Sequence, residues 1–218
     1  MLFPGLRTEI AKTFRLLNET SLTFGFSGNI SVRAPQEGLF IITPSGLKKA
    51  RLNPEDMIVV DSKGNVIEGT KKPSVETPMH LAIYENRKDV KAIIHAHPIY
   101  STVFAVTGVN IIPVTEEMIL YTGGEVRVAK YALFGTEALA RNVLKALGDR
   151  RAVLLRNHGI VACGKDLDEA MDVLLCVERE AEIILLSKLL RKPKLLPKET
   201  VDLEKKLYKE KIKEARDS

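Results

Sequence analysis

The sequence predicts one α/β domain in which helices cover both faces of a central sheet, a three-layer α/β/α arrangement with a mixed, largely antiparallel sheet. With 218 residues, 45% of them apolar and 28% charged, the chain is long enough to bury one substantial core. Apolar runs of strand length alternate with amphipathic stretches of helix length. Several expected strands are joined by hairpin turns, which favours antiparallel pairing. We expect residues 1–192 to form this domain and residues 193–218 to form a polar helical tail.

In the first half of the chain, the spacing of apolar residues predicts an amphipathic helix over residues 6–24 that Gly25 ends. A glycine-bearing loop at residues 27–29 then runs into a strand. Turn-forming residues mark the boundaries of the elements that follow. These are a strand over 39–43, a helical turn over 52–56, a strand over 57–60 and a hairpin turn at 61–65 that leads to 66–67. A loop over 71–78 then opens a helix that runs to about residue 86, and a strand that carries His95 and His97 follows.

In the second half, Pro113 indicates that residues 111–114 form a short strand at an edge of the sheet, because proline cannot donate a hydrogen bond inside it. Asp166 is placed to cap a long helix over 167–190 that is apolar on one face and charged on the other. The very polar helix expected over 199–215 must either pack on the body of the chain or stay loose. The other expected elements are helices over 99–106 and 135–148 and strands over 152–157 and 160–163.

The net charge of +5 comes from the end of the chain, where residues 188–218 hold 11 Lys and Arg against 6 Asp and Glu. The first 187 residues carry 22 of each sign, so the body lacks the basic stripe that is typical of nucleic-acid binding. No apolar run approaches the roughly 20 residues of a membrane span, and no signal peptide is evident. Cys163 and Cys176 lie in apolar surroundings, which favours buried thiols over a disulfide. We therefore expect a cytoplasmic protein without nucleic-acid or membrane partners.

Three of the four histidines stand at the ends of apolar, strand-like runs. His95 and His97 are two residues apart, so in a strand their side chains point to the same face. His158 ends a second such run. Three imidazoles are the ligand set of a catalytic zinc site with an open position, although manganese, cobalt and iron also accept imidazole. The alternative is three core histidines that hydrogen-bond to the backbone, which would make this arrangement an unusual coincidence.

Glu76 stands where a loop turns into a helix, and beside a metal ion it would be a general base with a pKa raised by burial. Taken alone, it is also explained as a first-turn glutamate that interacts with the helix dipole. Three loops offer backbone N–H groups, hydroxyls and an amide, a set that binds phosphate without lysine, although each loop alone is an ordinary turn. The residues expected to hold phosphate or substrate are Gly28, Asn29, Thr43, Ser45, Gly46 and Ser74.

Five motifs, in this order, resemble those of the class II aldolase/adducin family, and most closely its archaeal L-fuculose-1-phosphate aldolase members. They are Ser27–Ser31, Thr43–Gly46, Pro73–Glu76, His95–Pro98 and Asn157–Gly164, and the resemblance extends over residues 5–190. It implies an α/β/α domain and a homotetramer of four-fold symmetry with active sites between subunits. It also implies a zinc ion on His95, His97 and His158, a catalytic role for Glu76, and phosphate held by Gly28, Asn29, Thr43, Gly46 and Ser74.

Two positions depart from the pattern of the family. Val75 stands where the family usually has a second small hydroxyl residue before the glutamate. Glu117 stands where the bacterial fuculose-phosphate enzyme has a tyrosine contributed by a neighbouring subunit. It looks more like the acid/base of methylthioribulose-1-phosphate dehydratases, although archaeal aldolase relatives also carry acidic residues in this segment. Alternatively, Glu117 is a solvated residue at the start of a helix. Tyr208 in the polar tail is a further candidate for this role, unless the tail helix is solvated or packs on another subunit.

The resemblance implies a zinc-dependent class II sugar-phosphate aldolase, a lyase of carbohydrate metabolism. Its expected reaction cleaves a ketose 1-phosphate, such as L-fuculose 1-phosphate, to dihydroxyacetone phosphate and L-lactaldehyde. The alternatives are a methylthioribulose-1-phosphate dehydratase or a sugar-phosphate epimerase of the same family, and a non-catalytic, adducin-like interaction domain. The intact set of three histidines with Glu76 argues against the interaction domain.

Overall fold

One eight-stranded sheet organises the computed structural model, which describes residues 1–48 and 51–217. The strands are β1 (Asn29–Arg33), β2 (Leu39–Ile42), β3 (Ile58–Asp61), β4 (Val66–Glu68), β5 (Ala92–Ala96), β6 (Arg127–Ala129), β7 (Ala152–Leu155) and β8 (Gly159–Gly164). Their order across the sheet is β4-β3-β2-β1-β5-β8-β7-β6. Neighbouring strands are antiparallel except β6 and β7, which are parallel. The expected mixed, largely antiparallel sheet is confirmed.

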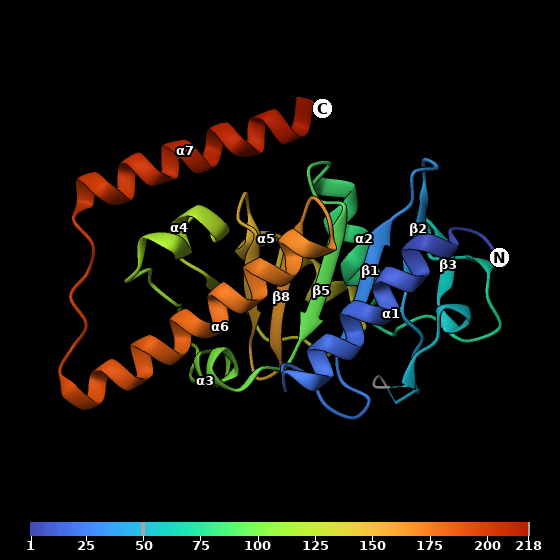
Figure 1. Ribbon diagram of the computed structural model, residues 1–218, viewed down its shortest axis with the longest axis horizontal. Helices are drawn as coiled ribbons and strands as arrows, with labels where there is room; N and C mark the ends of the chain where they lie inside the picture. Colours follow the sequence, from blue (N-terminus) through green and yellow to red (C-terminus); the bar gives the residue numbers. More distant parts are fainter. Residues whose placement is uncertain (49–50, 218) are drawn as a thin grey trace.

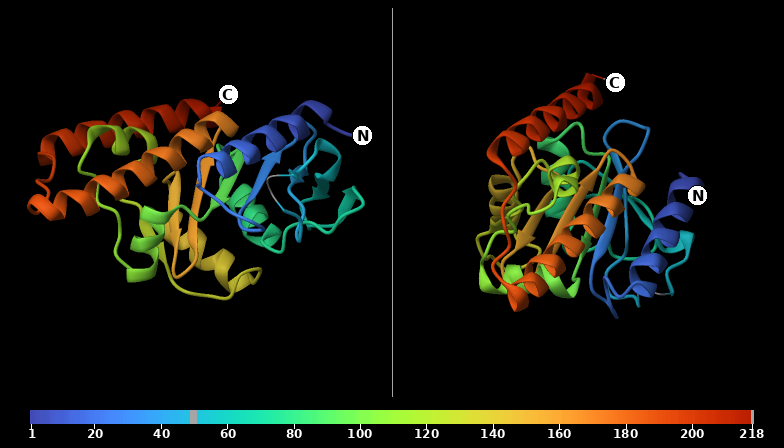
Figure 2. Two further views of the ribbon diagram at one scale, coloured as in Figure 1. Left: turned by 60° about the horizontal axis from the view of Figure 1, so that its bottom comes forward. Right: turned by 60° about the vertical axis from the view of Figure 1, so that its left-hand side comes forward.

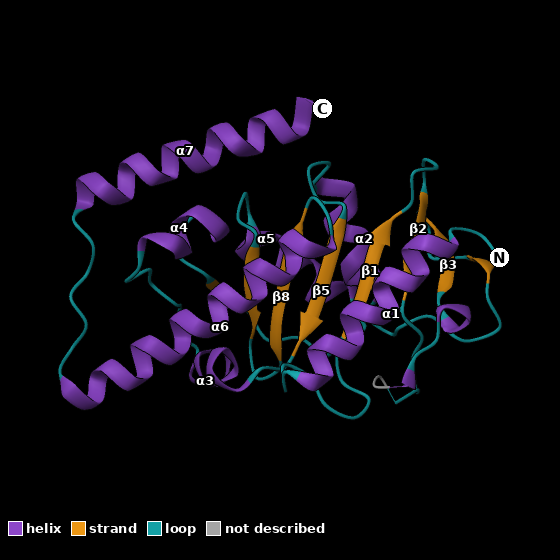
Figure 3. Ribbon diagram, in the orientation of Figure 1, coloured by secondary structure: helices purple, strands orange, loops and turns teal. Residues whose placement is uncertain are grey.

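Helices cover both faces of the sheet and give the expected three layers. They are α1 (Pro4–Glu19), α2 (Thr77–Asn86), α3 (Ile99–Thr107), α4 (Glu116–Thr122), α5 (Glu137–Leu147), α6 (Leu167–Leu190) and α7 (Lys198–Asp217), with a 3-10 turn η2 at Pro54–Asp56. α1, α3 and α6 pack on one face, and α2 and α5 pack on the other (Figures 1 and 3). Each face therefore has its own apolar cluster, and the sheet separates the two.

β5 is the strand around which the functional residues gather, and it is buried along its whole length between β1 and β8. Ile94 points into the apolar cluster under α1 and α6, whereas Ile93 points into the cluster under α2 and α5. Because side chains alternate along a strand, His95 shares the face of Ile93 and is directed towards α2. The register pairs His95 with Asn29 of β1 and with Val161 of β8.

The first helix ends at Glu19, so the expected extension to residue 24 was wrong. The hydroxyl of Thr20 donates to the carbonyl oxygen of Leu16 at 2.7 Å, and Ser21 has a left-handed backbone with φ 59°. Polar side chains that bond to the nearby backbone favour the end of a helix. Leu22 lies beyond this end but is still buried, which explains why its spacing suggested a longer helix.

The expected strand over residues 111–114 was also wrong, because only Ile111 pairs, in an isolated bridge with Val126. Pro113 has no N–H group, and the N–H groups of Val114 and Thr115 donate to the carboxylate of Glu180 on α6 instead of to a strand. The short elements α4 and β6, which the apolar pattern did not indicate, follow this loop.

Both cysteines are free, as expected, but only Cys163 is fully buried, whereas Cys176 is partly exposed. Burial raises the pKa of the Cys163 thiol to about 11, so this side chain stays protonated and behaves as a small apolar residue. Among the described residues, no helix is both long and apolar enough to cross a membrane.

The polar last helix packs on the body of the chain. α7 doubles back alongside α4 after the loop that follows α6 (Figures 1 and 2). Tyr208 is 4% exposed, and its hydroxyl donates to the carbonyl oxygen of Asp149 at 3.0 Å. Lys211 Nζ lies 2.9 Å from a carboxylate oxygen of Glu169 on α6. The division of the chain at residue 192 stays a prediction.

A buried carboxylate joins two arginines at the end of the sheet where β7 begins. The Asp89 carboxylate accepts two hydrogen bonds from Arg87, at 2.9 and 2.7 Å. Arg151 lies 3.8 Å from the same carboxylate and 3.4 Å from Glu169. Asp89 and both guanidinium groups are almost completely buried, so each charge depends on the others for compensation.

We predict that Asp89→Asn lowers the free energy of unfolding by about 3–5 kcal/mol, because it leaves two buried guanidinium groups without their shared counter-charge. Urea denaturation followed by circular dichroism measures this change. Arg141→Ala is the matched control, since its ion pair with Glu137 is exposed and such pairs contribute little. Equal stability of Asp89→Asn and the control would contradict the assignment.

Candidate active site

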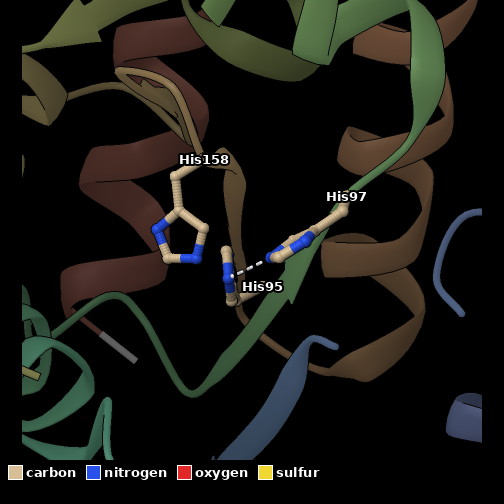
Figure 4. A group of neighbouring side chains, drawn as sticks. All are labelled: His95, His97 and His158. Atoms are coloured by element: carbon tan, nitrogen blue, oxygen red, sulfur yellow. Dashed lines mark hydrogen bonds between the residues drawn. The ribbon is translucent and has the colours of Figure 1, made fainter. Parts of the chain in front are cut away.

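Three histidine rings face one another at the end of β5. His95 lies in β5, His97 directly follows it, and His158 lies in the turn between β7 and β8 (Figure 4). The ring centroids are 4.7, 4.7 and 4.9 Å apart, and His97 Nε2 lies 2.9 Å from His95 Nε2. One ring nitrogen from each histidine lies within 4.8 Å of the others. The structure therefore brings together the three residues predicted as metal ligands.

The backbone near His158 permits this close approach. Asn157 has a left-handed conformation, φ 57°, which turns the chain tightly between β7 and β8. A Cβ atom on Gly159 would lie 2.8 Å from His97 Cδ2 and closer still to the carbonyl oxygen of Ala96. Glycine is therefore required here by the closeness of β8 to the end of β5 and not by its own φ angle.

The ring orientations fit a metal ion. His95 Nδ1 donates to the carbonyl oxygen of Ile160 at 2.9 Å, which leaves the Nε2 lone pair for a metal. Burial, together with the two neighbouring imidazoles, lowers the pKa of His97 to about 3, so its ring is neutral, as a metal ligand must be. In a tetrahedral zinc site two ligand nitrogens lie about 3.3 Å apart, so an ion fits after small side-chain movements.

Glu76 brings a buried carboxylate to the same place. It precedes the first residue of α2 and is 5% exposed. Its Oε2 lies 3.1 Å from His95 Nε2 and accepts a hydrogen bond from Asn29 Nδ2 at 2.8 Å. Its Oε1 lies 3.9 Å from His158 Nδ1 and is buried without a hydrogen-bond partner among the described residues. A buried carboxylate with an unpaired oxygen is costly unless a cation or a substrate proton meets it, so this geometry also fits a metal site.

The three loops predicted to hold phosphate meet beside this carboxylate. The backbone N–H of Ile30 donates to Thr43 Oγ1 at 3.1 Å, and Ser74 N–H donates to the carbonyl oxygen of Thr43 at 3.1 Å. The Ser74 hydroxyl in turn accepts from the N–H of Glu76 at 3.3 Å. The loops predicted to hold phosphate thus adjoin the Glu76 carboxylate, which in turn lies beside the histidines.

Residues of these loops differ in how they are placed. Gly28 has φ 77°, and a Cβ atom there would lie 2.7 Å from the His95 carbonyl oxygen, so its position requires glycine. The side chain of Asn29 is already bonded to Glu76 and to His80. Ser45 is partly exposed and Gly46 is exposed. Their binding of phosphate stays a prediction.

Two candidate acid/base residues lie elsewhere in this chain. Glu117 is exposed on α4 and lines a pocket of about 240 Å³ between α4 and α6, whose lining includes none of the three histidines. Tyr208 is buried, and its hydroxyl is bonded to Asp149. Asp149 precedes β7 and His158 follows it, so they lie at opposite ends of that strand. The geometry of one chain therefore does not place Tyr208 at the site.

His80, together with Ser31 and Tyr84, was missed by the sequence reasoning. His80 lies on α2, four residues after Glu76, and is 1% exposed. Its Nε2 lies 2.6 Å from Asn29 Oδ1, and its Nδ1 lies 2.6 Å from Ser31 Oγ. The i, i+4 spacing of Glu76 and His80 was the available signal, since it places both side chains on one face of the helix.

Known proteins match this chain over most of its length. The family model of the class II aldolase and adducin N-terminal domain matches residues 8–185. A 5-deoxy-D-ribulose 1-phosphate aldolase of Bacillus thuringiensis serovar kurstaki is 39% identical over 202 residues, covering 93% of this chain and 94% of that protein. A 5-methylthioribulose-1-phosphate/5-deoxyribulose-1-phosphate aldolase of Rhodospirillum rubrum is 39% identical over 199 residues, covering 91% and 88%. A solved L-fuculose 1-phosphate aldolase structure has a TM-score of 0.88 at 42% identity, covering 93% and 95%.

We predict that Gly159→Ala weakens zinc binding by about 10–100-fold, because the added methyl group pushes His97 away from the other two rings. Competition with a fluorescent zinc chelator measures the affinity. Gly5→Ala is the control, since a Cβ atom there meets nothing within 4 Å. Unchanged zinc affinity in folded Gly159→Ala protein would contradict the expected role of this close contact.

Proposed function

This chain belongs to the class II aldolase and adducin family, and we propose that it is a metal-dependent aldolase, a lyase that cleaves a ketose 1-phosphate to dihydroxyacetone phosphate and an aldehyde. The observation that carries this proposal is the buried Glu76 carboxylate, which lies between the histidine cluster and the converging phosphate loops. Candidate substrates are L-fuculose 1-phosphate, which would give L-lactaldehyde, and 5-deoxyribulose 1-phosphate, which would give acetaldehyde.

The chain's own groups suit this chemistry. In the addition direction, Glu76 Oε1 takes a proton from the hydroxyl-bearing carbon of dihydroxyacetone phosphate. The electron pair left on that carbon forms a bond to the aldehyde carbon, and Glu117 gives a proton to the aldehyde oxygen. Cleavage is the reverse of these steps. A divalent metal on His95, His97 and His158, for which we propose zinc with manganese, cobalt or iron as substitutes, supplies positive charge that stabilises the negative charge developing on the substrate oxygens.

Val75 is the position at which we expect the substrate preference of this chain to differ from that of hydroxyl-bearing relatives. Its side chain is 54% exposed beside Ser74, and its carbonyl oxygen lies near Gly135. An apolar side chain removes one hydroxyl donor from the phosphate loop, so it changes how the phosphate end of the substrate is held. The names of the Bacillus and Rhodospirillum relatives support 5-deoxy and 5-methylthio sugars as substrates, since both end in an apolar group.

Dehydration of methylthioribulose 1-phosphate and epimerisation of a sugar phosphate are the alternatives within the family. Both use a metal and a base, so the site geometry does not favour them over aldol cleavage. A non-catalytic interaction domain has no need for a buried, half-paired carboxylate beside three histidines. The names of the similar proteins support the aldolase.

We also propose a cytoplasmic homotetramer in which each site is completed by a neighbouring subunit. Large apolar side chains remain exposed next to the site: Phe24 and Phe26 precede the Gly28 loop, and Leu133 and Phe134 precede Gly135, which lies against Val75. Patches of this kind often mark protein interfaces. The exposed position of Glu117, away from the histidines of its own chain, fits a role in the site of a neighbour.

We predict that the zinc-loaded protein releases dihydroxyacetone phosphate from L-fuculose 1-phosphate or 5-deoxyribulose 1-phosphate, measured with a coupled glycerol-phosphate dehydrogenase assay. Glu76→Gln should lower kcat by about 10²–10⁴-fold, because the base that moves the carbon-bound proton is lost. Methylthioribulose 1-phosphate is assayed in parallel, with mass spectrometry of the products. Loss of water from that sugar, without dihydroxyacetone phosphate from any of the three, would establish the dehydratase instead.

We predict that Glu76→Gln and Glu117→Gln subunits complement each other. If Glu117 acts in the site of a neighbour, randomly mixed tetramers regain about a quarter of wild-type sites, because one neighbour then supplies Glu76 and the other Glu117. The subunits are dissociated, mixed in equal amounts and reassembled before the cleavage assay. Activity no higher than the mean of the two variants would exclude a role for Glu117 between subunits.

A further inference from the structure

His80 is the one histidine outside the metal cluster, and it is connected to that cluster through Asn29. A row of side-chain hydrogen bonds leads from Tyr84 to Ser31 (2.8 Å), His80 (2.6 Å), Asn29 (2.6 Å) and finally Glu76 (2.8 Å). All five residues are buried, so water does not compete for these groups. The row joins α2 to β1 and ends on the proposed catalytic carboxylate.

The direction of every hydrogen bond in this row follows from the carboxylate. An ionised Glu76 only accepts, so Asn29 must turn its NH₂ group towards Glu76 Oε2 and its Oδ1 towards His80. His80 Nε2 must then carry the hydrogen, which leaves Nδ1 to accept from the Ser31 hydroxyl. The oxygen of Ser31 accepts in turn from the Tyr84 hydroxyl. Each donor therefore has one acceptor, and no side chain in the row can exchange its donor and acceptor roles unless its neighbours do so too.

The charge states agree with this direction. Burial lowers the pKa of His80 to about 3, so the ring is neutral and carries a single N–H. Burial likewise raises the pKa of the Tyr84 hydroxyl above its ordinary value, so it keeps its proton for Ser31. A doubly protonated His80 would offer a donor to Ser31 and disrupt the row.

We propose that His80 is a positioning residue for the aldol reaction: it holds the amide of Asn29 so that the amide binds Glu76 Oε2 and leaves Oε1 to exchange the proton with the substrate carbon. This inference rests on the proposed function. The asymmetry is already present in the structure, since Oε2 is held by Asn29, whereas Oε1 is buried with no hydrogen-bond partner in the described part of the chain. Without the His80 N–H, Asn29 Oδ1 loses its donor inside the protein, so the amide is no longer held in place and can shift away from Glu76 Oε2.

The pair His80→Gln and His80→Asn tests this proposal with variants of similar polarity. The amide nitrogen of glutamine reaches the position of His80 Nε2 and still donates to Asn29. Asparagine reaches only the position of Nδ1, so it keeps the contact with Ser31 and loses the donor to Asn29. The readouts are kcat and KM for ketose 1-phosphate cleavage, and the exchange of dihydroxyacetone phosphate hydrogen with D₂O without aldehyde, followed by NMR. The rise in melting temperature on adding zinc shows whether the histidine cluster is intact.

We expect His80→Asn to lower kcat and the exchange rate together by about 100-fold, with KM and the zinc-induced shift close to wild type, because the base is misplaced while binding is kept. His80→Gln should stay within about tenfold of wild type, because it keeps the donor that orients Asn29. A His80→Asn protein that exchanges hydrogen as fast as His80→Gln would overturn the proposal, as would equal losses in kcat, KM and the zinc shift. A wild-type protein that neither exchanges hydrogen nor cleaves the ketose 1-phosphates would contradict the proposed function itself. An active wild type whose two His80 variants behave alike would contradict only the role of His80.

Discussion

The antiparallel register of β5 between β1 and β8 is the constraint on which the site depends. It sets His95 opposite Asn29 on one side and brings the Ile160 carbonyl oxygen to His95 Nδ1 on the other. A shift of one residue would turn His95 and His97 to the opposite face, into the apolar cluster under α1 and α6. Gly28 and Gly159 lie beside the end of the same strand, where a Cβ atom would collide with β5 or with His97. The strand register and the two glycines together therefore place the histidines at the end of β5.

α2 adds the chemistry that the sheet cannot supply. Its start carries Glu76, and its first turn carries His80, so one helix face presents both to β1. A carboxylate with one unpaired oxygen is unfavourable inside a protein. The structure limits this cost through the Asn29 hydrogen bond to one oxygen and leaves the other for a cation or a substrate. A functional site is where a protein is expected to keep a polar group that lowers its stability because the group is needed for function.

The sequence was sufficient for the features that depend on local pattern. Two histidines at i and i+2 in an apolar run must share a strand face, and Asp166 caps α6 as its position indicated. The apolar pattern predicted the wrong structure where residues distant in sequence form the hydrogen bonds. Glu180 accepts from the backbone N–H groups of Val114 and Thr115, next to the strand expected over 111–114. The partners of His80 are 49 and 51 residues away in sequence, so only the packing of α2 on β1 could reveal them. Glu117 has no place in the site of its own chain, and a single sequence does not carry the geometry of a second copy.

The arrangement also separates the two halves of the proposed reaction. The histidines, Glu76 and the loops predicted to hold phosphate come from one chain, and they would act on dihydroxyacetone phosphate, the product that both candidate ketose 1-phosphates have in common. The aldehyde half would face the exposed apolar residues next to the site, together with groups from a neighbouring subunit. Side chains in that outer region can change without disturbing the hydrogen-bond row behind Glu76, since none of them takes part in it. We therefore expect relatives that share the histidine, glutamate and loop motifs to differ in the aldehyde that they accept.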